Sequence, residues 1–280
     1  MNVINGRGGL PMVQIQTPWS AAEIYLHGAS VTHFQLHGEP PLLFLSEQSR
    51  FEKEAPIRGG IPIIFPWFGK PEGRATQHGF ARIRSWELVD VRKQTDGSIQ
   101  VHLSLPASAE LLAVPLEYYV TVGRTLTTEL VITNFSDGDF QCENCLHTYF
   151  TVGDINQVSV AGLQGVEYLD SLDGRTRKQE MAAAIRFTGE VDRVYLNTPH
   201  ATEIRDPALG RVIRVEKEGS LSTVVWNPWI AKAKAMADFG DDEYPRMVCV
   251  ESGNCGENAL HLAAGQESRL KINLSSQTLA

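Results

Sequence analysis

Residues 99–105 read Ile-Gln-Val-His-Leu-Ser-Leu, a strict alternation of apolar and polar side chains. Successive side chains of a β-strand point to opposite faces, so this stretch is typical of a half-buried strand. The same period of two recurs at residues 116–122 and at residues 270–274. The pattern therefore predicts a β-strand in each of the three stretches.

Turn-forming dipeptides such as Asp96-Gly97 and Asp173-Gly174 separate the alternating stretches along the chain. Helical patterns are scarce, and the best of them, residues 107–113 and 231–237, are too short to be the repeated crossovers of a βαβ protein. A TIM barrel and a Rossmann fold are thereby disfavoured. We expect a large all-β protein, an antiparallel sandwich or barrel.

The chain has 280 residues, of which 42% are hydrophobic and 21% charged, which is enough apolar material for a sizeable core. No linker, composition shift or repeat divides it. We therefore expect a single domain over residues 1–280, since all-β folds often reach this length.

The formal net charge of −8 disfavours nucleic acid or an anionic membrane as the main partner, because both require a dominant cationic surface. No stretch approaches the ~20 consecutive apolar residues of a membrane span, and the N-terminus lacks the apolar core of a signal peptide. A cytoplasmic protein is expected, with its four cysteines reduced. We also expect a monomer whose partner is a small-molecule substrate.

The first segment that could take part in binding or catalysis begins with Arg58-Gly59-Gly60-Ile61-Pro62. It continues to Gln77-His78-Gly79-Phe80-Ala81-Arg82. Paired glycines let the backbone approach a ligand, and an adjacent arginine suits phosphate or carboxylate. Residues 56–86 hold five basic side chains against one acidic, a local excess of four positive charges on an acidic chain. An anion site is one interpretation, and a tight turn with solvated arginines is the alternative.

The second segment, residues 142–150, contains Cys-x-x-Cys followed by His147. Residues three apart on a strand face opposite ways and cannot share a metal, so a zinc site is disfavoured. The same alternation places Cys145, His147 and Tyr149 on one face. His147 is either a catalytic candidate or a structural histidine.

The third segment is residues 246–253, in which Cys249 and Glu251 share one strand face. A carboxylate that ends an apolar run is costly unless it is exposed, paired or used. The alternative to a functional Glu251 is an exposed residue at the end of the strand. The acidic run 238–243 is interpreted as a solvated turn. Asp192 either opens a short strand or forms a turn.

Several aromatic side chains could stack on the faces of a sugar, although most large aromatics are simply core. The candidates are Trp67, Phe68, Tyr149, Trp226 and Trp229.

Taken in order, six motifs resemble the hexose-phosphate mutarotases of the aldose 1-epimerase family. They are Arg-Gly-Gly-Ile-Pro with Phe-Pro-Trp-Phe-Gly (58–69), Gln-His-Gly-Phe-Ala-Arg (77–82), Leu-His-Thr-Tyr-Phe (146–150), Asp-Arg-Val-Tyr (192–195), Trp-Asn-Pro-Trp (226–229), and Asp-Phe-Gly-Asp-Asp-Glu-Tyr with Met-Val-Cys-Val-Glu (238–251). The resemblance covers residues 20 to 275, nearly the whole chain. It implies a galactose mutarotase-like β-supersandwich and an isomerase that interconverts the α and β anomers of glucose 6-phosphate without a metal or organic cofactor.

The resemblance also implies roles for individual residues. It makes His147 the catalytic histidine and Glu251 the catalytic carboxylate. Since opening the sugar ring requires a base at O1 and an acid at O5, we expect Glu251 to be the base and a protonated His147 the acid. The substrate-binding residues that it implies are Arg58, Gln77, His78, Arg82 and Asp192. Leu146 stands where epimerases of free sugars usually have asparagine before the histidine, which favours a phosphorylated substrate.

Two alternatives remain open. The first is an epimerase of unphosphorylated sugars, and the second is a carbohydrate-binding protein without catalysis.

Overall fold

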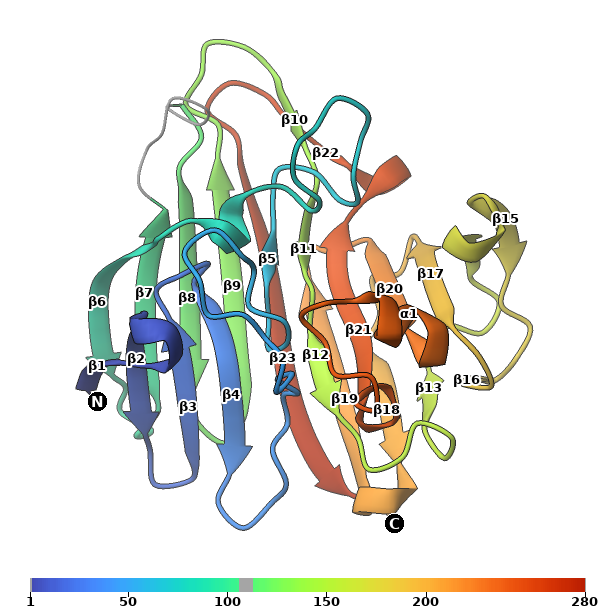
Figure 1. Ribbon diagram of the computed structural model, residues 1–280. Helices are drawn as coiled ribbons and strands as arrows, with labels where there is room; N and C mark the ends of the chain where they lie inside the picture. The colour runs from blue at the N-terminus through green and yellow to red at the C-terminus, as the bar shows by residue number, and fades with distance from the viewer. Residues whose placement is uncertain (1, 106–112, 280) are drawn as a thin grey trace.

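The computed structural model describes residues 2–105 and 113–279, almost all of whose regular structure is β-strand (Figure 1). The three predicted strands are confirmed as β7 (Ile99–Leu105), β8 (Leu116–Val122) and the middle of β23 (Glu267–Thr278). The second predicted helix is confirmed as α1 (Trp229–Ala235). The first predicted helix covered residues 107–113, of which residues 107–112 lie outside the described residues.

The described residues form two large and two small sheets, and all ladder pairings between their strands are antiparallel, as predicted. One large sheet follows the order β16 (Ala184–Arg186), β13 (Ser159–Ala161), β18 (Thr202–Asp206), β19 (Arg211–Glu218), β23, β9 (Leu126–Thr133), β8, β7 and β6 (Glu87–Lys93). The other follows the order β15 (Thr176–Gln179), β14 (Glu167–Asp170), β17 (Val191–Leu196), β20 (Ser222–Asn227), β21 (Met247–Asn254), β11 (Asn144–Leu146) and β5 (Ile63–Ile64), with β12 (Tyr149–Thr151) also on β21.

The smaller sheets complete the sandwich. They consist of β1 (Asn2–Asn5), β2 (Pro11–Gln16), β3 (Ser20–Tyr25) and β4 (Ser30–Leu36), and of β10 (Phe140–Cys142) with β22 (Leu260–Leu262). In Figure 1 the blue strands β1–β4 lie in front of β7–β9, and the β20–β21 region lies in front of β18 and β19. Six short 3-10 turns lie among the described residues: Arg7–Gly9, Ala81–Ile83, Ser171–Asp173, Pro207–Leu209, Tyr244–Arg246 and Gly256–Asn258.

The main hydrophobic core fills the space between these layers. Alternation along each strand directs one set of side chains inward, for example Leu103 of β7, Val225 of β20 and Val250 of β21. The opposite set on the sheet of β20 and β21 faces outward, where Cys249 packs in a smaller cluster with Ala233 of α1. The outer face of this sheet is therefore available for a site.

No helix in residues 2–105 and 113–279 is both long enough and apolar enough to span a bilayer. The single-domain organisation stays a prediction.

The paired glycines 59 and 60 serve the fold and do not face a ligand, which corrects the sequence-based expectation. Both have positive φ angles, 126° and 65°. A Cβ on Gly60 would lie 2.2 Å from the carbonyl oxygen of Val31, and its N–H donates to the carbonyl of Phe44. Only glycine permits this close packing of the loop that carries Arg58 against neighbouring backbone.

We expect Gly60→Ala to destabilise the protein by more than the ~1–2 kcal/mol that a left-handed alanine costs, because the clash with Val31 adds to it. Gly38→Ala is the matched control, since Gly38 has a φ of 83° with nothing within 4 Å of the added Cβ. Urea unfolding of both variants measures the difference. Equal losses would show that the close approach does not matter.

Candidate active site

A cavity of about 240 Å³ lies on the outer face of the sheet that contains β17, β20 and β21. Its walls are formed by these strands, by the loops around residues 58, 68 and 78, and by α1. All seven residues proposed from the sequence line it: Arg58, Gln77, His78, Arg82, His147, Asp192 and Glu251. The fold thus brings together side chains separated by almost 200 positions.

Glu251 lies within β21 and does not end it, because the strand continues to Asn254. Its neighbour across the ladder is Val224 of β20, and its side chain is 1% exposed. The alternative of an exposed glutamate at a strand end is therefore wrong. A carboxyl group buried this deeply in a sheet needs partners or a use.

His147 lies between β11 and β12, where its ring stacks on Tyr149 with centroids 4.7 Å apart. Its Nδ1 lies 3.3 Å from Oε1 of Glu251. The contact lacks hydrogen-bond geometry, so Nδ1 is a buried polar atom without a hydrogen-bond partner in the described chain. Such an atom at the wall of a cavity is suited to a partner supplied by a ligand.

The electrostatics of this pair differ from the expectation of a protonated His147. Burial, together with His78, Arg82 and Arg58, lowers the pKa of His147 well below its usual value. Burial and the charge of Asp192 raise the pKa of Glu251 well above its usual value. Both shifts favour a neutral imidazole beside a protonated carboxyl group when the cavity holds no substrate. The favourable effect of nearby carboxylates on the imidazolium is outweighed by burial and by positive charge.

Arg58 is tied to the protein by its guanidinium group. Nε and Nη2 donate to Asp238 at 3.2 and 3.0 Å, and Nη1 donates to the hydroxyl of Tyr149 at 3.0 Å. Burial opposes its charge, but Tyr149 and Asp238 outweigh it and raise the pKa of Arg58. Asp238 is therefore a partner of the site, whereas its segment had been interpreted as a solvated turn.

Arg82 differs from Arg58 in that no carboxylate of the described residues forms an ion pair with its guanidinium group. Its side chain is 7% exposed, and Nη2 donates to the backbone carbonyl of Gln77 at 2.8 Å. No carboxylate in the described part of the chain forms an ion pair with it. Burial and Arg58 lower the pKa of Arg82 to about 10, so it remains charged at neutral pH. A buried, unpaired guanidinium at a cavity wall is suited to an anion.

His78 is held as a neutral imidazole next to the catalytic candidates. Its Nδ1 accepts a hydrogen bond from the N–H of Gly69 at 3.1 Å, and its ring lies edge-on to His147 at 5.7 Å between centroids. Burial, Arg82 and Arg58 lower the pKa of His78 to about 3. Nε2 lies 3.1 Å from the side-chain amide of Gln77, which is exposed at the mouth.

Asp192 comes from β17, directly across the ladder from Trp226. Burial raises its pKa, although a hydrogen bond with Ser171 and the charges of Lys232 and Arg175 oppose the rise. Ser171, Arg175 and Lys232 line the cavity, and sequence reasoning missed all three. Their segments carry no motif, and only the tertiary fold brings them to the site.

The aromatic candidates separate into two groups. Phe68 and Trp226 line the cavity, and Tyr149 supports both His147 and Arg58 from behind. Trp67 instead donates to the carbonyl of Thr76, and Trp229 packs on Tyr244.

Possible metal-ligating atoms of His147, Cys249 and Glu251 lie within 4.8 Å of one another. However, the guanidinium groups that lower the pKa of His147 would also repel a cation at this position. Cys249 itself packs in the cluster with Ala233 of α1. The absence of a cofactor stays a prediction.

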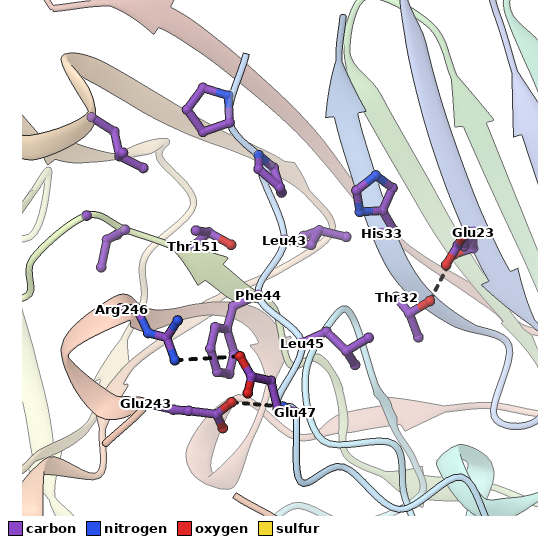
Figure 2. A pocket seen from close by; sticks show the side chains of 15 residues that line it. Glu23, Thr32, His33, Leu43, Phe44, Leu45, Glu47, Thr151, Glu243 and Arg246 are labelled. Atoms are coloured by element: carbon purple, nitrogen blue, oxygen red, sulfur yellow. Dashed lines mark hydrogen bonds and ion pairs between the residues drawn. The ribbon is translucent and has the colours of Figure 1, made fainter. Parts of the chain in front are cut away.

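A second and larger hollow, of about 540 Å³, lies between β4, β12 and the turn before β21 (Figure 2). None of the seven proposed residues lines it. Its acidic group Glu243 accepts hydrogen bonds from Ser46 and from the backbone N–H of Glu47, and Arg246 lies near Glu47. Glu243 is thus paired within the protein, whereas Glu23 and His33, which also line this hollow, lie opposite each other on β3 and β4 and are partly exposed. Glu243 is buried. The expectation that it belongs to a solvated turn is therefore wrong.

The antiparallel β-sandwich of this chain is the fold of mutarotase-like proteins. A crystal structure described provisionally as a mutarotase from Salmonella typhimurium matches with a TM-score of 0.89 at 29% identity, covering 99% of this chain and 97% of that one. The family model for aldose 1-epimerase matches residues 11–275. The chain belongs to the aldose 1-epimerase family and is an isomerase.

Two curated relatives carry the provisional name glucose-6-phosphate 1-epimerase. One, from Cenchrus ciliaris, is 39% identical over 272 residues, which is 91% of this chain and 81% of the relative. The other, from Escherichia coli K12, is 34% identical over 254 residues, which is 89% of this chain and 84% of the relative.

The lowered pKa of His78 predicts a pH dependence of stability. An unfolded chain binds a proton at this histidine below pH ~6.5, and the folded chain binds it only near pH 3. The free energy of unfolding should therefore fall as the pH drops below ~6.5, by up to ~1.4 kcal/mol per pH unit from this group. Urea unfolding between pH 7 and 5 should show a shallower fall in His78→Gln. Identical slopes would contradict the assignment.

Proposed function

We propose that this enzyme interconverts the α and β anomers of glucose 6-phosphate and related hexose 6-phosphates. The observation that carries the proposal is the buried guanidinium of Arg82, which forms no ion pair within the described residues and opens on the same cavity as His147 and Glu251. A hexose 6-phosphate combines an anion with a hemiacetal carbon, and this cavity offers a partner for each. The names of the relatives from Cenchrus ciliaris and Escherichia coli agree with this substrate.

Anomer exchange opens the pyranose ring, rotates the C1 carbonyl and closes the ring on its other face. Opening requires that O1 lose a proton while O5 gains one, so one acid and one base suffice. Glu251 acts as the base at O1 and His147 as the acid at O5, and the two reverse roles on closure. Each proton transfer is worth ~10²–10⁴-fold in rate.

The substrate phosphate sets the protonation that this mechanism needs. Without substrate, burial and the positive charge of Arg82 and Arg58 disfavour an imidazolium at His147. A bound phosphate dianion offsets that charge and favours the ionised pair, in which Glu251 is a carboxylate and His147 an imidazolium. The number of protons on the pair stays the same. Phosphate thus contributes to catalysis as well as to affinity.

The remaining residues hold the sugar. Arg82 provides the free charge for phosphate, and Arg58 supports it with a guanidinium fixed by Asp238. Gln77, His78 and Asp192 orient the hydroxyl groups from the cavity wall. Monomeric state, cytoplasmic location and the absence of a nucleic-acid partner stay predictions.

We expect Glu251→Gln to abolish mutarotation of glucose 6-phosphate while substrate binding persists, because glutamine keeps the shape but cannot take a proton. Polarimetry measures the reaction, and calorimetric titration measures binding. Exchange at the wild-type rate in this variant would refute the role of Glu251. A simultaneous loss of binding would assign Glu251 to affinity instead.

We expect Arg82→Ala to lower kcat/KM for glucose 6-phosphate by ~10- to 100-fold, the usual value of a hydrogen bond to a charged group, with little effect on free glucose. Arg74→Ala is the control, since Arg74 is an exposed cation of the same segment that lies over Trp67. Equal losses on both sugars would show that Arg82 does not recognise phosphate.

A further inference from the structure

The pairing of β11 with β21 brings a cysteine thiol to Glu251. Cys145 lies directly opposite Gly253, which shares a strand face with Glu251. A Cβ on residue 253 would lie 2.8 Å from Cβ of Cys145, so only glycine lets the cysteine lie over β21. Sγ of Cys145 consequently reaches Oε2 of Glu251 at 3.4 Å.

The carboxyl group of Glu251 is therefore held between two side chains. Oε1 faces Nδ1 of His147, and Oε2 accepts from the thiol of Cys145. Glu251 is 1% exposed and Cys145 is fully buried, so water does not replace either contact. Within the described chain, Cys145 is the side chain that donates a hydrogen bond to this carboxylate. Burial raises the pKa of the Cys145 thiol, which keeps its proton available for donation.

We propose that Cys145 is a positioning residue for catalysis, whose thiol orients the Glu251 carboxylate toward the sugar and stabilises its charged form. This inference rests on the proposed function, in which Glu251 is the base. A hydrogen bond to the ionised form of a carboxyl group favours ionisation and opposes the effect of burial. Without the thiol, Oε2 would face an apolar wall, and the base would be both less oriented and less ionised.

Charged and titratable groups face Glu251 from each neighbouring element. They are Cys145 from β11, His147 from the loop after it, Cys249 on β21 itself, Asp192 from β17, and Arg82 from the turn after Phe80. Substitution at residue 145 leaves the others in place. A change in the titration of Glu251 is therefore attributable to the thiol.

The test compares three variants. Cys145→Ala removes the donor, and Cys145→Ser restores a donor at the same position. Cys142→Ala is the matched control, because Cys142 is a buried cysteine of β10 that does not line the cavity. The infrared carboxyl band that disappears in Glu251→Gln reports the titration of Glu251 without substrate. The pH profile of glucose 6-phosphate mutarotation reports the same group during catalysis.

We expect Cys145→Ala to raise the titration midpoint of Glu251 by about half a unit to one unit, the effect of one weak hydrogen bond. The alkaline limb of the kcat/KM profile, where the pair loses its one proton from Glu251, should move by the same amount, so that activity below it falls several-fold while activity above it changes little. Cys145→Ser should return both toward the wild type, and Cys142→Ala should move neither.

An unchanged midpoint in Cys145→Ala, or a loss of activity that is equal at every pH, would overturn the inference and leave a packing role. If Cys145→Ala does not fold, an unshifted midpoint and limb in Cys145→Val, which fills the buried position without a donor, would overturn it equally. The infrared midpoint does not depend on turnover. A wild-type protein without mutarotase activity would therefore refute the proposed function separately from the contact between Cys145 and Glu251.

Discussion

The burial of one carboxyl group in the middle of a sheet is the constraint on which the site depends. Glu251 lies on β21, with β20 on one side and β11 on the other, so the two ladders that build the sheet also set its position. Isolating such a group from water is costly, and the surroundings decide its protonation. His147 and Cys145 reach its two oxygens because the same strand pairing aligns them. The geometry of this cavity is a direct consequence of antiparallel register.

The two arginines of the cavity differ in whether their charge is already paired within the protein. Asp238 and Tyr149 hold Arg58, so this guanidinium is fixed before a substrate arrives. Arg82 has no comparable partner in the described chain, and it therefore provides the attraction for an anion. A chain with a net charge of −8 can in this way offer a local site for one phosphate while repelling polyanions.

Much of this arrangement was predictable, and the failures have physical causes. Alternation at residues 99–105 and 116–122 predicted strands correctly, because a half-buried strand enforces a period of two. The six motifs, taken in order, predicted seven residues that line the cavity. The role of Gly59 and Gly60 was wrong, since a glycine that approaches backbone looks the same in sequence as one that approaches a ligand. Three further features depend on tertiary contacts that no local pattern encodes. They are the ion pair of Asp238 with Arg58, the burial of Glu251, and the position of Arg175 and Lys232 at the cavity wall.

The central claim is that the acid–base pair and the anion site act on one molecule of hexose 6-phosphate. Magnetisation exchange between the C1 signals of the two anomers measures this most directly, with catalytic amounts of the wild-type enzyme and with glucose 6-phosphate, glucose and galactose compared at equal concentration. We expect faster anomer exchange on addition of enzyme, with kcat/KM much higher for glucose 6-phosphate than for either free sugar. No acceleration for glucose 6-phosphate, or a preference for galactose, would contradict it.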